Sequence, residues 1–172
     1  MSSSDIKAEI IAALRDLREA LKPKAAIFDL DGVLVDSSER YRLCESEAAG
    51  DRRRFWECFL SEKYMDLDRP RTEYVETLRR YAAQGYRIII VTGRVEERQK
   101  NKTLRQLSDW GITFHEIYFR RAGDYRKDYE FKSEIVRNLS KKYRIVAVFE
   151  DSKPVAEALR KLLPDAEIHL VQ

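Results

Sequence analysis

Short apolar runs that alternate with amphipathic segments constrain the fold of this sequence more than any other feature. The apolar runs predict strands at residues 24–30, 86–92, 114–119, 144–150 and 167–171. Segments with the apolar spacing of a helix predict helices at residues 71–84, 95–110, 130–142 and 153–163. This repetition predicts an α/β fold with a doubly wound, largely parallel sheet of about five strands and helices on both faces. Functional sites in such folds form at the carboxyl ends of the strands.

The amino-terminal residues carry a separate pattern. Apolar residues recur at steps of three and four, which predicts an amphipathic helix over residues 5–22: Ile6, Ile10, Leu14, Leu17 and Leu21. Ser4 is a candidate N-cap and Pro23 a stop. We therefore expect a helical extension, residues 1–22, before a single domain at residues 23–172. Its apolar seam either packs onto that domain, which is the simpler outcome, or pairs two chains, so the protein is a monomer or a homodimer.

Residues 36–70 interrupt the alternation of strand and helix. They carry helical patterns at residues 39–49 and 51–63 but no strand pattern, and Pro70 is placed to open the next helix. We interpret this segment as a small helical cap inserted into the domain. Asp51 is its expected internal N-cap. The apolar face that follows is expected to serve mostly as core packing: Phe55, Trp56, Phe59 and Leu60.

Length and composition fit one domain, since 172 residues with 44% hydrophobic content suffice for a full core. The 33 Lys and Arg against 30 Asp and Glu leave a net charge of +3, which is not the signature of a nucleic-acid-binding protein. Cys44 and Cys58 lack the second pair that a zinc site needs, and we interpret them as reduced thiols. The sequence contains no apolar signal core and no membrane-length span, which predicts a cytoplasmic protein without a membrane partner.

Two carboxylates stand directly after the first apolar run. The alternation of a strand points the side chains of Asp29 and Asp31 to the same side, and Gly32 permits a sharp turn beyond them. One carboxylate can then attack a phosphorus atom while the other transfers a proton. Because Asp-Gly after an apolar run is also an ordinary turn, this segment does not decide the function alone.

Further polar groups follow the other predicted strands, and together they are far more specific than any one of them. In their order along the chain they resemble the four motifs of the haloacid dehalogenase superfamily: Asp29-Leu30-Asp31-Gly32-Val33, Thr92, Lys132 and Glu150-Asp151. The resemblance covers nearly everything from residue 24 to residue 172. It implies a three-layer, Rossmann-like fold and a phosphatase or phosphotransferase chemistry.

A closer resemblance is to the 3′-phosphatase domain of phage-type polynucleotide kinases. In that family, arginines matching Arg40 and Arg94 and an aspartate matching Asp128 serve the active site. Two departures limit the analogy: the sequence has no kinase P-loop, and its acidic pair is Glu150-Asp151 where the kinase-linked phosphatases have two aspartates. The Glu-Asp-Ser form looks more like sugar-phosphate mutases and small-molecule phosphatases of the same superfamily.

The chemistry assigns a role to each motif residue. Asp29, ionised at neutral pH, is the expected nucleophile and forms an aspartyl-phosphate that water later cleaves. Asp31 is the expected general acid-base, which protonates the leaving alkoxide and then activates the water. Thr92 and Gly93 are expected to face the phosphoryl oxygens with a hydroxyl and backbone N–H groups. Lys132 supplies a positive charge to the same oxygens and to Asp29.

Two carboxylates beside a phosphate dianion require a hard divalent cation, and Mg²⁺ suits a shell of carboxylate, water and phosphate oxygens. We expect Asp29 and Asp151 as side-chain ligands. The resemblance implies the main-chain carbonyl of Asp31 as another ligand, with Glu150 holding waters or Lys132. Taken alone, Glu150 and Asp151 could instead be an N-cap pair for the following helix.

The two arginines admit two interpretations. Arg94 and Arg40 are candidates for clamping the substrate phosphate, because guanidinium binds such groups in a bidentate fork. The alternative is that both are ordinary exposed arginines. Asp128 either orients Lys132 or Arg94, or it caps the helix that follows.

The sequence therefore predicts a Mg²⁺-dependent phosphomonoesterase, a hydrolase of the haloacid dehalogenase type. Its phosphorylated substrate is either a nucleic-acid 3′-end, which the small cap and the arginines favour, or a small nucleotide or sugar phosphate. A hypothesis of another class is a non-catalytic nucleic-acid-binding module that keeps the fold without turnover. Such a module would bind without metal and with a steep salt dependence.

Overall fold

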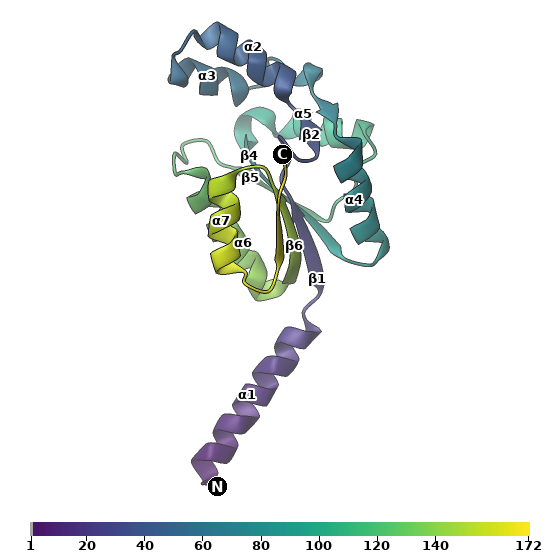
Figure 1. Cartoon of the computed structure of the whole chain (residues 1–172), viewed down its shortest axis with the longest axis vertical. Helices are drawn as coiled ribbons and strands as arrows, with labels where there is room; N and C mark the ends of the chain where they lie inside the picture. Colours follow the sequence, from purple (N-terminus) through teal and green to yellow (C-terminus); the bar gives the residue numbers. More distant parts are fainter. Residues whose placement is uncertain (1) are drawn as a thin grey trace.

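A five-stranded parallel sheet forms the centre of the computed structural model, which describes residues 2–172 (Figure 1). Its strands stand in the order β5-β4-β1-β6-β7, and every neighbouring pair is parallel. The strands are β1 Lys24–Phe28, β4 Arg87–Val95, β5 Glu116–Arg120, β6 Arg144–Glu150 and β7 Glu167–Leu170. The chain runs from β1 outwards to β4 and β5 and then crosses to the other side of β1 for β6 and β7. The predicted doubly wound sheet is confirmed, and this reversal of direction marks where sites form in such sheets.

Two pairs of helices cover the two faces of the sheet. They are α4 Thr72–Ala83, α5 Glu96–Asp109, α6 Asp128–Lys142 and α7 Lys153–Leu162, each within two residues of its predicted bounds. Helices α4 and α5 pack on the face that carries Ile88 and Ile90, whereas α6 and α7 pack on the face that carries Ile89 and Val91. Adjacent residues of a strand point to opposite faces, so a sheet covered on both sides requires the continuous apolar runs seen in the sequence.

The insert between β1 and α4 forms a small cap beyond the carboxyl edge of the sheet (Figure 1). Its helices are α2 Ser38–Ala48, α3 Arg52–Phe59 and the short 3-10 helix η1 Met65–Leu67. Asp51 caps α3 as predicted, because its carboxylate accepts hydrogen bonds from the backbone N–H groups of Arg53 and Arg54.

Two expectations for the insert are wrong. It contains strands, because β2 (Val35–Asp36) pairs antiparallel with β3 (Arg69–Pro70). Pro70 therefore lies in a strand, and the next helix begins only at Thr72. Strands of two residues carry no alternation that a sequence pattern could reveal.

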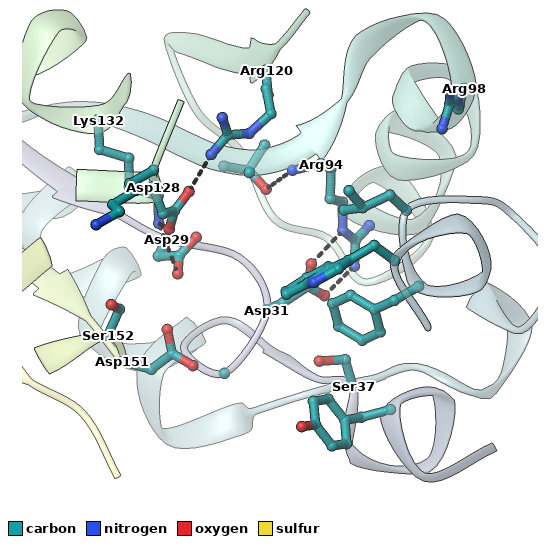
Figure 2. Close-up of a pocket in the computed structure, with 18 of the residues that line it drawn as sticks. Asp29, Asp31, Ser37, Arg94, Arg98, Arg120, Asp128, Lys132, Asp151 and Ser152 are labelled. Carbon is teal, nitrogen blue, oxygen red and sulfur yellow. Dashed lines mark hydrogen bonds and ion pairs between the residues drawn. The ribbon is translucent and has the colours of Figure 1, made fainter. Parts of the chain in front are cut away.

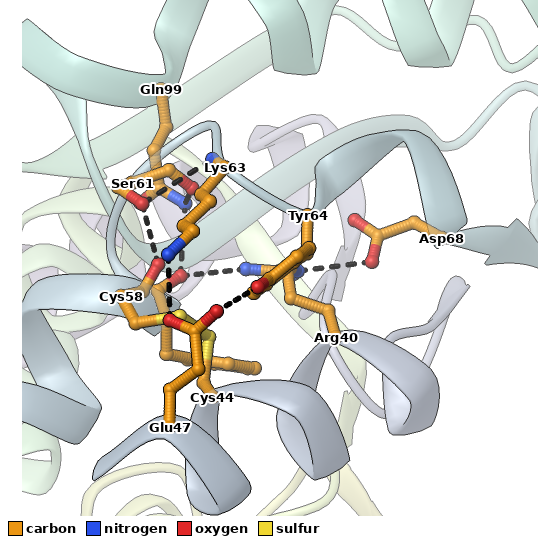
Figure 3. Close-up of a disulfide and its surroundings, with 10 residues drawn as sticks. Arg40, Cys44, Glu47, Cys58, Ser61, Lys63, Tyr64, Asp68 and Gln99 are labelled. Atoms are coloured by element: carbon orange, nitrogen blue, oxygen red, sulfur yellow. Dashed lines mark hydrogen bonds and ion pairs between the residues drawn. A yellow bond between two sulfur atoms is a disulfide. The ribbon is translucent and has the colours of Figure 1, made fainter.

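The cysteines form a disulfide, so the prediction of reduced thiols is wrong (Figure 3). Cys44 of α2 and Cys58 of α3 have Cα atoms 5.6 Å apart, within the range that a disulfide spans. The physical reason is the return of the chain at Ala49 and Gly50, both with positive φ, which places α3 alongside α2. Sequence spacing alone carries no information on that return.

Helix α1 (Ser3–Leu21) extends away from the sheet and buries none of its residues (Figure 1). Ser2 is its N-cap, in a capping box with Asp5, in place of the expected Ser4. The expectation that its apolar seam packs onto its own domain is wrong, since the Ile and Leu side chains of the seam are all exposed. In residues 2–172, no helix is both long and apolar enough to cross a membrane.

Candidate active site

The acidic motif residues meet at the carboxyl edge of the sheet, where the strand order reverses. Asp29 follows β1 and is buried, and its backbone N–H donates to the carbonyl of Phe149 in β6 (3.0 Å). This bond continues the pairing of β1 with β6, and so it places Asp29 beside the end of β6, where Glu150 and Asp151 stand. Carboxylate oxygens of Asp29, Glu150 and Asp151 lie within 4.8 Å of one another.

Lys132 reaches into this acidic cluster from α6 (Figure 2). Its Nζ atom lies 2.8 Å from Glu150 Oε2, 3.2 Å from Asp29 Oδ2 and 3.5 Å from Asp128 Oδ2. Burial alone would lower the pKa of Lys132, but the carboxylates of Asp29, Glu150 and Asp128 raise it well above its usual value. The lysine therefore stays protonated, and it is buried in the site as predicted from the motif order rather than on the surface.

The single positive charge of Lys132 does not balance the carboxylates of Asp29, Glu150 and Asp151. Burial and the charges of Glu150 and Asp151 raise the pKa of Asp29 well above its usual value, against the opposing effect of Lys132. Partial desolvation and the neighbouring Glu150 raise the pKa of Asp151 to about 6. Raised pKa values indicate a site short of positive charge, and an oxygen-only cluster of this kind fits a hard divalent cation.

Asp151 also closes against the turn that follows Asp31. Gly32 has a φ of 85°, which a residue with a side chain rarely adopts, and a Cβ atom at this position would lie 2.1 Å from Asp151 Oδ2. Glycine is therefore required here both for the turn and for the approach of Asp151. The alternative that Glu150 and Asp151 serve only as helix caps does not explain this contact, since the N-cap of α7 is Ser152.

Asp31 is held by two arginines. Arg94 binds it in a bidentate fork, with Nε 3.0 Å from Oδ2 and Nη2 2.8 Å from Oδ1, and Arg40 Nη2 donates to Oδ1 as well. Burial on its own would raise the pKa of Asp31, but Arg94 and Arg40 together hold it well below its usual range. The Asp31 side chain is 19% exposed and borders the cavity described below.

Both arginines are fully buried, so the interpretation of Arg40 and Arg94 as ordinary exposed residues is wrong. A second carboxylate, Asp68, binds them from the cap, with Oδ1 3.0 Å from Arg40 Nε and Oδ2 3.1 Å from Arg94 Nη2. Arg40 and Arg94 each pair with both Asp31 and Asp68, so two positive and two negative charges balance between the cap and the sheet. Sequence reasoning missed Asp68 because it belongs to no motif and precedes a strand too short to recognise.

The remaining predicted residues line the same edge. Thr92 lies in the carboxyl-terminal half of β4 and is buried. Its hydroxyl accepts a hydrogen bond from the backbone N–H of Arg94 (3.1 Å). Gly93 borders the cavity next to Asp128, whose Oδ1 would lie 3.2 Å from a Cβ atom at that position. Asp128 begins α6, and it contacts Lys132 and Arg120 (2.8 Å to Nη2) but not Arg94. Arg120 is a further cationic residue of the site, to which the sequence assigned no role.

A cavity of about 1330 Å³ opens above these groups. Its floor contains the motif residues at the ends of the strands, and its walls come from the cap, α5 and the loop before α6: Tyr41, Arg53, Trp56, Phe59, Leu60, Arg98, Tyr125, Arg126 and Lys127. The expectation that the apolar cap residues serve mostly as core packing holds for Phe55, which is fully buried, but not for Trp56, which is exposed.

Comparison with known proteins supports one family. Residues 23–166 match the model of the polynucleotide kinase PNKP phosphatase domain. Among solved structures, chains from the Pnkp1/Rnl/Hen1 complex and from the Pnkp1/Rnl/Hen1 RNA repair complex each align with a TM-score of 0.68 and 26% identity. These alignments cover 88% and 87% of this chain, which spans 46% and 42% of the length of the two neighbours.

The class C acid phosphatase from Bacillus anthracis, solved with tungstate bound, is similar in fold, with a TM-score of 0.62 and 17% identity. That alignment covers 96% of this chain and 72% of the acid phosphatase. The fold is therefore that of the haloacid dehalogenase phosphatases, as the order of the motifs indicated. Together with the match over residues 23–166, it establishes that the chain belongs to the family of PNKP phosphatase domains.

Proposed function

We propose that this chain is a Mg²⁺-dependent phosphomonoesterase that removes the 3′-phosphate of a nucleic-acid end through an aspartyl-phosphate. The observation that carries the proposal is the meeting of Asp29, Asp31, Lys132 and the Glu150-Asp151 pair at one sheet edge, below a cavity of about 1330 Å³. Small-molecule sites usually measure about 300–1,000 Å³, so a cavity of this size favours a polymer end over a single metabolite.

Asp29 is the nucleophile in this proposal. One of its oxygens bonds to phosphorus while the bond from phosphorus to the ester oxygen breaks. Lys132, 3.2 Å from Asp29, remains charged and stabilises both the carboxylate and the phosphoryl oxygens. The hydroxyl of Thr92 and the backbone N–H of Gly93, in the carboxyl-terminal half of β4, supply further donors.

Asp31 transfers the protons. Its proton goes to the leaving 3′-oxygen in the first step. In the second step its carboxylate takes a proton from the water that attacks phosphorus, while the bond from phosphorus to Asp29 breaks and releases inorganic phosphate. Arg40 and Arg94 keep the group deprotonated in the free protein, which is the form needed for the second step. The negative charges of a bound phosphate monoester raise the pKa of Asp31 and favour the protonated form needed for the first step.

The carboxylates of Asp29 and Asp151 and the main-chain carbonyl of Asp31 would hold Mg²⁺, with Glu150 between the metal shell and Lys132. The bound ion would supply positive charge to offset these carboxylates and the incoming phosphate.

The test is Mg²⁺-dependent phosphate release from four substrates: a 3′-phosphorylated oligonucleotide, a 5′-phosphorylated oligonucleotide, a mononucleotide and a sugar phosphate. We expect the 3′-phosphorylated oligonucleotide to be hydrolysed fastest, and Asp29→Asn to abolish hydrolysis of it and of p-nitrophenyl phosphate. Equal slow rates on all four substrates would contradict the nucleic-acid assignment. Full activity of Asp29→Asn would contradict the nucleophile, and metal-independent binding without turnover would support a binding module.

A further inference from the structure

The exposed aromatic side chains of the molecule all line one cavity. Tyr41, Trp56 and Tyr125 are 46%, 48% and 92% exposed, and every other phenylalanine, tyrosine and tryptophan within residues 2–172 is buried or partly buried. All three lie on the wall of the cavity above Asp29. Large aromatic rings are costly to leave in water, so their gathering around one cavity is a feature that the hydrolytic chemistry does not explain.

The cap holds two of these rings rigidly. Phe55 is fully buried beneath them, with its ring centroid 4.9 Å from that of Trp56 and 4.8 Å from that of Tyr41, both in edge-to-face geometry. Phe59 contacts the same cluster and lines the cavity. The disulfide from Cys44 to Cys58 ties α2, which carries Tyr41, to α3, which carries Trp56 (Figure 3). The rings therefore present fixed surfaces to the cavity.

One arginine that lines this cavity, Arg98, forms no ion pair with a described residue. Arg98 is exposed and lines the cavity, and no ion pair or side-chain hydrogen bond joins it to any residue in the described range 2–172 (Figure 2). Its neighbour Gln99 donates to the carbonyls of Phe59 and Ser61 (both 3.3 Å), which fixes this part of α5 against the end of α3. Two other cationic residues of the wall are paired, Arg53 with Glu57 and Arg126 with Asp124. Lys127, also exposed, forms no ion pair with a described residue, but it lies in the loop before α6, away from the cap that carries Tyr41 and Trp56.

Flat aromatic rings and an unpaired guanidinium, which here line the same cavity, are the two elements that bind single-stranded nucleic acid without reading its sequence. We propose that Trp56 and Tyr41 stack against bases of the unpaired nucleotides that lead to the 3′-phosphate, and that Arg98 contacts a backbone phosphate of the same strand. This inference rests on the proposed function and assigns the residues that select a single-stranded polymer end. Every base has a stacking face, so the preference is for strand type and not for sequence.

The kinetic test measures kcat/KM of the whole chain, with Mg²⁺ present, for two substrates. These are a single-stranded 3′-phosphorylated oligonucleotide and p-nitrophenyl phosphate. Trp56→Ala is expected to lower the ratio of the two kcat/KM values by about 5- to 150-fold, the effect of one lost base stack. Trp56→Phe, which keeps a ring, should restore most of the ratio. An unchanged ratio in Trp56→Ala would overturn the inference while the proposed function stands.

Arg98 has a matched control on its own helix. Arg105 lies two turns further along α5, is exposed, and is not part of the cavity wall. Arg98→Ala should raise KM for the oligonucleotide and reduce the salt dependence of binding by the equivalent of about one phosphate contact, whereas Arg105→Ala should do neither. Equal effects of the two substitutions would overturn the assignment of Arg98.

Binding is also measured without turnover, which separates this inference from the proposed function. In Asp29→Asn, the oligonucleotide should quench the fluorescence of Trp56, and adding Trp56→Phe should remove the quenching, because the remaining Trp110 does not line the cavity. Absence of quenching in Asp29→Asn would overturn the stacking proposal whatever the enzyme hydrolyses. Quenching in Asp29→Asn, combined with no phosphatase activity of the unsubstituted protein, would support the stacking proposal and contradict the proposed function.

Discussion

A methyl group added at position 32 should disturb the proposed metal site much more than the stability of the fold. Gly32 has a φ of 85°, and a Cβ atom there would lie 2.1 Å from Asp151 Oδ2 and 2.6 Å from Asp151 Cγ. The Asp151 carboxylate must therefore retreat by about 1 Å or more before the contact becomes an ordinary van der Waals contact. Gly32→Ala thus displaces a proposed metal ligand without removing it.

Two effects of Gly32→Ala can be estimated. The left-handed backbone conformation costs about 1–2 kcal/mol of stability for a residue with a Cβ atom. A displacement of about 1 Å at a reacting site costs about 100-fold in rate. We therefore expect a modest loss of thermal stability, a rate about 100-fold lower, and loss of most of the rise in unfolding temperature that Mg²⁺ produces by binding the folded state.

Gly85→Ala is the matched control. Gly85 has a φ of 84°, and a Cβ atom there would meet nothing within 4 Å. It should lose the same stability as Gly32→Ala in denaturant unfolding, while it keeps phosphatase activity and the Mg²⁺-dependent rise in unfolding temperature. If Gly32→Ala kept both as well, the reasoning that places Asp151 in the metal site through this turn would be refuted.

Three further predictions concern other parts of the molecule. Asp68→Asn removes a negative charge from buried Arg40 and Arg94 and should lower the free energy of unfolding, measured in urea, by about 3–5 kcal/mol. Asp66→Asn breaks only the pair of exposed Asp66 with Lys102 and should lower it by about 0–1 kcal/mol. Equal losses in the two variants would contradict the role of Asp68. Because the pKa of Asp151 is raised to about 6, this carboxylate is protonated below that pH and ionised above it, so Mg²⁺ affinity measured by calorimetry should weaken as the pH falls through 6; an unchanged affinity would exclude Asp151 as a ligand. Removal of residues 1–21 should leave the unfolding temperature unchanged, since α1 buries no side chain, and a lower value would show that the helix packs against folded protein in solution.

The sequence was a good guide where the physical cause was local or periodic. Strands buried on both faces need unbroken apolar runs, and parallel strands bring their carboxyl ends to one edge, so the meeting of Asp29 and Asp151 could be predicted. Lys132 lies on a helix, and only the order of the motifs indicated that it joins them. Helical spacing likewise predicts that Asp128 is a neighbour of Lys132, because the two residues are one helical turn apart.

The sequence was a poor guide where the cause was tertiary. Whether Arg40 is exposed depends on Asp68, which lies 28 residues further along the chain and meets it only through the cap. The pairing of Cys44 with Cys58 depends likewise on a turn that reverses the chain. The exposure of α1 could not be inferred either. An apolar seam indicates that a helix can pack against another surface, but it does not indicate which surface.

The pairing of β2 with β3 has a consequence for how this domain can change. Val35 lies opposite Pro70 and Asp36 opposite Arg69, so the cap leaves and re-enters the core at adjacent points. For the sheet, the whole cap is a closed loop, and the entropy of closing a loop grows only slowly with its length. Caps of other sizes could be exchanged at this stem without disturbing the strands that carry the chemistry. Such an exchange would succeed only if the new cap returned an arginine and an aspartate to the places of Arg40 and Asp68, because Arg40 binds Asp31, the proposed proton-transfer group, and Asp68 binds Arg40 and Arg94.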